Sequence, residues 1–122
     1  MNMITGIPKN YHIIADVAYI PTVMIAPKLF HFEDEKTVTA ICKISSASDY
    51  AYSLFTDAPW GAHKIIPYRV HALIDFAHGA AALTAAIALP IRNKRARNTL
   101  LAMGITGLVI GTLSWIGSKY SD

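Results

Sequence analysis

Histidine and aspartate recur one helical turn apart at two places in a largely apolar sequence. The first pair is His12 and Asp16, and the second is His71 and Asp75, which His78 follows three residues later. Residues three or four positions apart lie on the same face of an α-helix. Imidazole and carboxylate groups are ligands for transition metals, and helix bundles build metal sites from such facing side chains. These five residues are therefore the candidate metal ligands.

Further polar residues are expected to extend this cluster. Asp49 and Tyr52 share one face of a second predicted helix, at a spacing of three residues. Asp57 lies in the following loop, where it would either cap the loop or pair with Arg69. The predicted polar cluster accordingly includes Asp49, Tyr52, Asp57 and Arg69.

Three interpretations of these buried polar groups remain open. Ionisable side chains in membrane helices cost roughly 2.5–3.5 kcal/mol each on insertion scales, so they persist where they face partners or water. In the first, each aspartate accepts hydrogen bonds from a nearby His, Tyr or Arg, and the network locks the bundle. In the second, the cluster binds a transition metal or haem; Asp75-x-x-His78 is similar to the carboxylate-x-x-His motif of di-iron bundles. In the third, the Asp and His side chains relay protons or pass a small solute.

Four apolar segments must position these residues. Hydrophobic residues make up 53% of the 122-residue chain and charged residues only 16%, below the roughly 25% usual for soluble domains. Helices are predicted at 11–32, 37–55, 69–91 and 99–116, each of about the 20 residues that cross a bilayer. The predicted fold is all-α: one domain, residues 1–122, forming a four-helix transmembrane bundle. The second segment contains Lys43 and Asp49, so a helix lying on the membrane surface is its alternative.

The chain also contains an internal repeat. The pattern His-x-x-x-Asp-x-Ala occurs at residues 12–18 and again at residues 71–77. Two parallel copies of one unit would make the bundle from two similar helical hairpins. They would also place His12 and His71 on the same side of the membrane.

Small residues form a stripe along the last predicted helix. Gly104, Gly107 and Gly111 are spaced three and four residues apart, and the last two form a GxxxG pair. Such stripes let helix backbones approach closely in lipid. Two alternatives follow, a packing seam within the chain or an interface for a homo-oligomer.

The charges and motifs exclude several classes of function. A net charge of +3, scattered along the chain, does not form a nucleic-acid surface. No Gly-rich phosphate loop, nucleophile elbow or Cys-x-x-Cys motif occurs, so nucleotide, hydrolase and thioredoxin-like chemistry lack support. The single Cys42 forms no intramolecular disulfide and is expected to pack in the interior. The basic run at 92–97 is typical of a cytoplasmic loop, which would leave both termini outside.

The segment 56–75 resembles a recurring segment of small bacterial inner-membrane proteins of the SPW-repeat type. In that family a Thr-Asp loop precedes a Pro-x-Arg-x-His helix start, and an Asp follows one turn later. Asp57, Pro67, Arg69, His71 and Asp75 occupy those positions, although the Ser-Pro-Trp tripeptide itself does not occur in this chain. The resemblance implies a multi-pass protein of the bacterial inner membrane with paired helical hairpins. It implies no activity.

These features predict a small, non-enzymatic integral membrane protein whose buried His/Asp cluster organises the bundle and offers a ligand site. The main alternative is a metal- or haem-binding redox protein, and the second is a proton-coupled carrier or channel subunit. The lipid bilayer is the expected partner. A metal site requires His12, His71 and His78 to converge, whereas a proton path requires the cluster to reach water on both faces.

Overall fold

Four α-helices account for most of the chain. The computed structural model describes residues 6–121. Its helices are α1 (Lys9–Leu29), α2 (Lys36–Leu54), α3 (Tyr68–Ala88) and α4 (Lys94–Ser121). None of the described residues belongs to a β-strand, and one isolated bridge joins Thr56 to Ile66 in the α2–α3 loop. The prediction of an all-α fold with four helices is confirmed.

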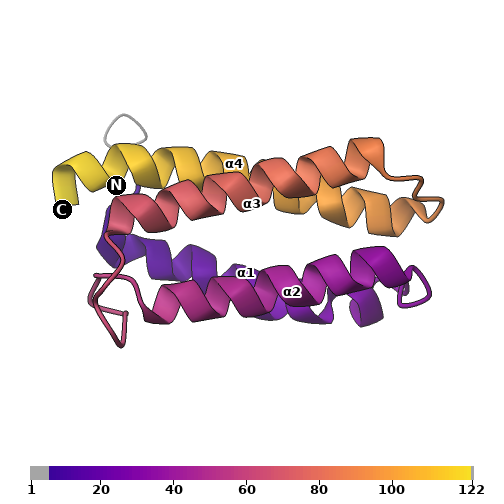
Figure 1. Cartoon of the computed structure of the whole chain (residues 1–122), viewed down its shortest axis with the longest axis horizontal. Helices are drawn as coiled ribbons and strands as arrows, with labels where there is room; N and C mark the ends of the chain where they lie inside the picture. Colours follow the sequence, from indigo (N-terminus) through magenta and orange to yellow (C-terminus); the bar gives the residue numbers. More distant parts are fainter. Residues whose placement is uncertain (1–5, 122) are drawn as a thin grey trace.

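The helices lie side by side along the long axis of the molecule and alternate in direction (Figure 1). The most extensive contact joins α3 to α4, the next joins α1 to α2, and α1 also packs against α4. The start of α1, the end of α4 and the α2–α3 loop lie at one end of the bundle. The α1–α2 and α3–α4 loops lie at the other end.

Helix α1 ends earlier than the sequence predicts, at Leu29 rather than at residue 32. His31 adopts a left-handed backbone conformation with φ 58°. The amide of Phe32 then donates a hydrogen bond of 2.9 Å to the carbonyl of Pro27. This is the pattern that closes many helix C-termini.

Helix α4 begins earlier than the sequence predicts, at Lys94 rather than at Thr99. The side-chain oxygen of Asn93 accepts hydrogen bonds from the backbone amides of Arg95 (2.9 Å) and Ala96 (3.2 Å). An asparagine in this position satisfies amides that have no partner within the first turn. Most of the basic run predicted as a loop is therefore the first turn of a helix.

The bundle buries polar side chains and exposes large apolar ones. His12 is fully buried and Asp16 is 4% exposed, whereas Ile14 and Ile87 are 68% and 76% exposed. Three helices, α1, α3 and α4, are long and apolar enough to cross a membrane. Helix α2, which carries Lys43 and Asp49, is not among them. This distribution is compatible with a protein whose outer surface faces lipid.

The apolar core fills the half of the bundle next to the α1–α2 and α3–α4 loops. Its buried members are Val23, Ala26, Phe32, Val38, Cys42, Ala82, Ala86, Ile91, Ala96, Leu100 and Met103. The buried polar side chains lie mainly in the other half, near the α2–α3 loop.

The glycine stripe of α4 packs directly on the backbone of α3. A Cβ atom at Gly107 would lie 2.6 Å from the Cα of Gly79, and one at Gly111 would lie 2.7 Å from the amide of Phe76. A Cβ at Gly104 would likewise meet the backbone of Leu83 at 2.9 Å. The three glycines therefore form a packing seam within the chain, the first of the two alternatives, and they set the distance between α3 and α4.

Candidate metal centre

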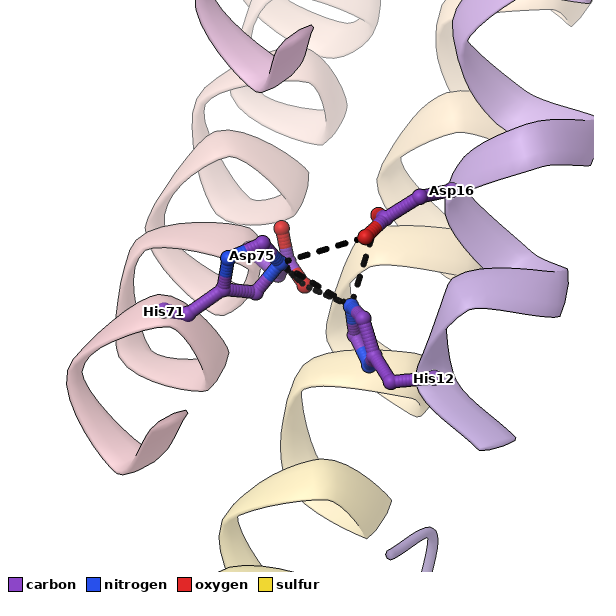
Figure 2. Close-up of side chains that lie close together, drawn as sticks. All are labelled: His12, Asp16, His71 and Asp75. Atoms are coloured by element: carbon purple, nitrogen blue, oxygen red, sulfur yellow. Dashed lines mark hydrogen bonds and ion pairs between the residues drawn. The ribbon is translucent and has the colours of Figure 1, made fainter. Parts of the chain in front are cut away.

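Two histidines and two aspartates meet in the interior of the bundle, in the half near the α2–α3 loop (Figure 2). His12 and Asp16 come from α1, and His71 and Asp75 come from α3. Each pair is one helical turn apart, so both members project from the same face of their helix. All four side chains are buried, and each can offer one nitrogen or oxygen atom within 4.8 Å of the other three. We call these residues the His/Asp quartet.

The distances between the facing atoms are short. The two Nε2 atoms of His12 and His71 are 3.0 Å apart. The Nε2 of His12 lies 3.3 Å from Oδ1 of Asp16 and 3.1 Å from Oδ2 of Asp75. The Nε2 of His71 lies 3.6 Å from Oδ2 of Asp16 and 3.3 Å from the same Oδ2 of Asp75. All five of these distances fall between 3.0 and 3.6 Å.

These spacings match the edges of a small coordination tetrahedron. Zinc and similar ions bind imidazole nitrogen and carboxylate oxygen at about 2.0–2.1 Å, which places neighbouring ligands of a tetrahedral ion about 3.3 Å apart. The three distances among the two Nε2 atoms and Oδ2 of Asp75, which are 3.0, 3.1 and 3.3 Å, are close to this value, and Asp16 places one oxygen near each imidazole. Its donor set, two nitrogens and two oxygens, suits zinc, iron and other divalent transition metals.

One oxygen of the quartet has no hydrogen-bond partner. Asp75 Oδ2 is buried and, among the described residues, receives no hydrogen bond. The other oxygen, Oδ1, accepts a hydrogen bond of 2.5 Å from the hydroxyl of Tyr52. A buried carboxylate oxygen needs a donor or a cation to offset the loss of water. Oδ2 faces both Nε2 atoms, so a cation at the centre of the quartet would satisfy it.

The outer nitrogen of each imidazole is held by a hydroxyl group. The hydroxyl of Thr56 donates to the carbonyl of Tyr52 at 2.7 Å, so its oxygen is left to accept from Nδ1 of His71 at 2.8 Å. Nδ1 of His12 lies 2.8 Å from the hydroxyl of Ser114 on α4. A proton on Nδ1 leaves the lone pair on Nε2, where it points into the quartet. Metal-binding histidines are usually oriented in this way by a second partner.

Aromatic rings close the quartet on the side of the α2–α3 loop. Trp60 stacks on His12 with ring centroids 5.9 Å apart, and Tyr68 meets the edge of the same ring at 5.4 Å. The indole nitrogen of Trp60 donates to the carbonyl of Lys9. These rings separate the quartet from the nearer end of the bundle, which lowers the local dielectric constant and strengthens electrostatic interactions inside.

A small cavity lies on the other side of the quartet. It has a volume of about 30 Å³ and is lined by Asp16, Asp49, Tyr52, Asp75 and His78, among other residues. A cavity of roughly 10–15 Å³ already holds one water molecule when polar groups surround it. The cavity could therefore bring water, or a ligand of similar size, next to the quartet.

Replacing Thr56 with valine is expected to weaken metal binding by about 10–100-fold, because His71 would lose the group that orients its ring. Thr84→Val is the matched control, since Thr84 is exposed on α3 and donates only to the carbonyl one turn earlier. Competition with a chromogenic chelator measures both affinities. Equal affinities in the two variants would show that the Thr56 hydroxyl does not orient a metal ligand.

The structure does not bring all of the predicted residues into the quartet. His78 lies on the wall of the cavity, where its ring meets the edge of Tyr52 at 5.5 Å. Asp49 is buried and accepts a hydrogen bond from Ser53 at 3.0 Å. Asp57 and Arg69 are exposed at the end of the bundle.

Sequence reasoning missed the partners of the two imidazoles and the aromatic lid. Those partners are Thr56 and Ser114. Neither position has a spacing relative to His12 or His71 that marks it as a partner.

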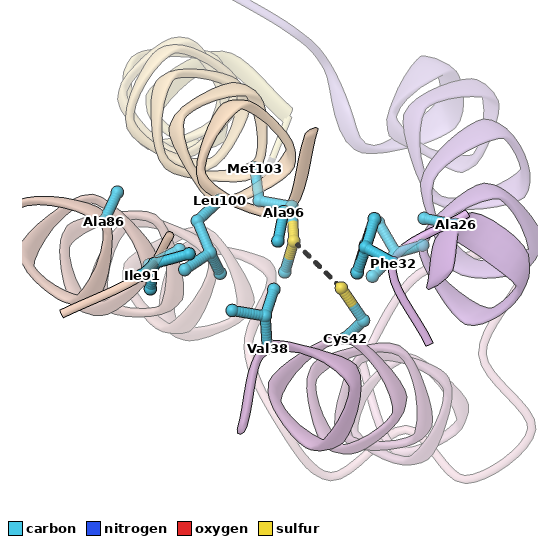
Figure 3. Packing of buried hydrophobic residues seen from close by; sticks show 11 residues of the cluster. Ala26, Phe32, Val38, Cys42, Ala86, Ile91, Ala96, Leu100 and Met103 are labelled. Atoms are coloured by element: carbon cyan, nitrogen blue, oxygen red, sulfur yellow. Dashed lines mark hydrogen bonds between the residues drawn. The ribbon is translucent and has the colours of Figure 1, made fainter. Parts of the chain in front are cut away.

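Cys42 lies in the apolar core, where its sulfur is 3.8 Å from that of Met103 (Figure 3). Its predicted packing role is confirmed.

Comparisons with known proteins returned no match for this chain, whether with protein-family models, curated proteins or solved structures.

Proposed function

We propose that this chain is a four-span membrane protein that binds one divalent transition-metal ion in the His/Asp quartet. The observation that carries the proposal is the spacing among the four side chains, with five nitrogen–nitrogen and nitrogen–oxygen distances of 3.0–3.6 Å. All four side chains are buried, and each offers one atom within 4.8 Å of the others. Metal sites in helix bundles are built from side chains in this arrangement.

Charge balance supports the same proposal. Two neutral imidazoles and two carboxylates carry two negative charges, which a divalent cation neutralises. A neutral site suits the interior of a membrane bundle, where an unbalanced charge is costly. A neutral imidazole whose Nδ1–H is held by a hydroxyl presents the lone pair of Nε2, which is the form that binds a metal.

A proton is the competing cation. The two Nε2 atoms are 3.0 Å apart, and two lone pairs at this distance repel each other unless a cation lies between them. Protonated imidazoles would also balance the two carboxylates, and the quartet would then be a structural lock without metal. The spacing favours a single ion over haem, because axial ligands on opposite sides of an iron would lie about 4 Å apart at bond lengths of 2.0–2.1 Å.

Titration of the detergent-purified protein with cobalt(II), after treatment with a chelator, tests the proposal. Tetrahedral cobalt(II) absorbs visible light much more strongly than the octahedral aqua ion, so binding in the quartet should give an intense band that saturates at one equivalent. His78→Ala is the matched control and should keep the band, because His78 lies on α3 but outside the quartet. A protein that gives no band, or loses it in His78→Ala, would refute the proposed site.

The four-span arrangement predicts that the two loops flanking α2 lie on opposite faces of the membrane. In a Cys42→Ser background, Asp57→Cys is expected to react with a membrane-impermeant thiol reagent added outside intact cells. Glu33→Cys is expected to react only in inverted vesicles. Glu33 lies at the same end of the bundle as the basic run at 92–97, and such basic runs are typical of the cytoplasmic side. Both positions are exposed. Labelling of both from the same face would show that α2 does not cross the membrane.

A further inference from the structure

A long groove runs between α1 and α4 on the outside of the bundle. It has a volume of about 700 Å³, and its described lining residues come from α1, its C-terminal cap and α4. Small side chains such as Ala15, Ala18 and Ala102 form much of its wall, together with Val23 and Met103. Because these side chains are short, the two helices leave a channel wide enough for an extended hydrocarbon chain.

One end of the groove is polar and positively charged. Arg95, Asn98 and Thr99 line it there, on the first turns of α4, next to Phe30 at the end of α1. Among the described residues, the guanidinium of Arg95 takes part in no ion pair, whereas that of Arg97 donates to the carbonyl of Ile91. None of the described residues that line the groove is acidic.

The basic charge at this end is concentrated. Besides Arg95 and Arg97, Lys94 is the first residue of α4, and Arg92 lies two residues before it in the α3–α4 loop. Three acidic residues occupy the α1–α2 loop at the same end of the bundle, at positions 33–35, but they do not reach the groove. Clusters of Lys and Arg at the end of a membrane helix attract anionic lipid, and basic pockets between membrane helices bind phosphate headgroups.

The length of the groove fits a lipid chain. It extends along α4 from Arg95 to Ile110, which at 1.5 Å per residue is about 22 Å. The hydrocarbon core of a bilayer is about 30 Å thick, so one leaflet accounts for about 15 Å. A headgroup at Arg95 would therefore lie at the interface, with one acyl chain entirely within the groove.

We infer that this groove binds an anionic phospholipid. Its phosphate would accept hydrogen bonds from the guanidinium of Arg95 and the side-chain amide of Asn98, and one acyl chain would lie between α1 and α4. Arginine is well suited to phosphate because its planar group offers several donors in a fixed geometry. The inference uses the membrane location in the proposed function but does not depend on the metal.

Native mass spectrometry of the full chain, purified in mild detergent with added phosphatidylglycerol or phosphatidylcholine, tests the inference. The wild-type protein should retain one phosphatidylglycerol in preference to phosphatidylcholine. Arg95→Gln should reduce phosphatidylglycerol retention about fivefold, since one basic residue near the headgroups contributes about 1 kcal/mol. Arg92→Gln, the matched control outside the groove, should have a smaller effect. Ala102→Phe should abolish retention of either lipid by filling the groove.

Three results would overturn the inference. The first is equal retention of the two lipids by the wild-type protein, and the second is an equal loss in Arg95→Gln and Arg92→Gln. The third is a wild-type dimer, without bound lipid, that dissociates in Ala102→Phe, which would assign the groove to a second copy of the chain. Fractionation of cells beforehand shows whether the chain is in the membrane, and so separates failure of the proposed location from failure of lipid binding.

Discussion

His71→Ala is expected to lower the affinity of the chain for a divalent transition metal by at least about 100-fold. Loss of a group that only orients a metal ligand already lowers the affinity about 10–100-fold, and this substitution removes the ligand itself. The reason is geometric. Nε2 of His71 lies 3.0 Å from Nε2 of His12, and it is one of the two nitrogen donors of the quartet. Three donors would remain, and water would have to supply the fourth in a buried site. Cobalt titration and elemental analysis of the purified variant measure the loss.

Stability must be measured alongside, because a purely structural network also predicts damage in His71→Ala. Removing one partner of a buried charged pair typically costs about 3–5 kcal/mol, since the other charge stays buried and unpaired. The double variant His71→Ala/Asp75→Ala removes both partners and should recover part of this loss. It should still bind no metal.

Thermal unfolding in detergent, with and without metal, then distinguishes the two interpretations. A metal that binds only the folded protein raises its melting temperature. The wild-type and His78→Ala proteins should show this rise, and the single and double variants should not. A metal-dependent rise that persists in the double variant would place the ion somewhere other than the quartet.

Gly107→Leu is expected to destabilise the bundle by about 3 kcal/mol or more, the upper end of the range for overpacked interiors. A Cβ at this position would already lie 2.6 Å from the Cα and 2.8 Å from the amide nitrogen of Gly79. These neighbours are backbone atoms, so no side-chain rotation can relieve the contact. Helices α3 and α4 would have to separate.

The same separation should disturb the metal centre. The Cβ at Gly107 would also lie 2.9 Å from the carbonyl oxygen of Asp75, so moving α3 away from α4 moves a quartet residue. Reduced cobalt binding is therefore expected together with a lower melting temperature. Ala77→Leu is the matched control, because Ala77 is exposed on α3 and has room for a larger side chain. Equal melting temperatures in the two variants would mean that the seam does not set the helix spacing.

The helices and their apolar character were predictable from short stretches of sequence. Helix formation and hydrophobic length depend on residues close together in the chain, and so does the placement of a His-x-x-x-Asp pair on one face. The helix ends were less predictable. The start of α4 depends on the side chain of Asn93, and the end of α1 depends on the left-handed conformation of His31.

The prediction of a membrane protein is supported by three of the four helices. Three helices have the length and composition of membrane spans, and α2, which the sequence marked as the weakest span, is not among them. The resemblance to the SPW-repeat type, the arrangement as two similar hairpins and their origin from one unit remain predictions.

The sequence by itself determined that His12 lies beside Asp16 and that His71 lies beside Asp75, because the geometry of a single helix sets those neighbours. It could not determine that the two pairs meet, that His78 faces a cavity instead, or that Thr56 and Ser114 hold the imidazoles. Those relations depend on how far each helix is rotated about its axis and shifted along it. Rotation and shift result from many contacts at once, including the glycine seam between α3 and α4. Only the packed bundle brings residues from α1, α3, α4 and the α2–α3 loop to one point.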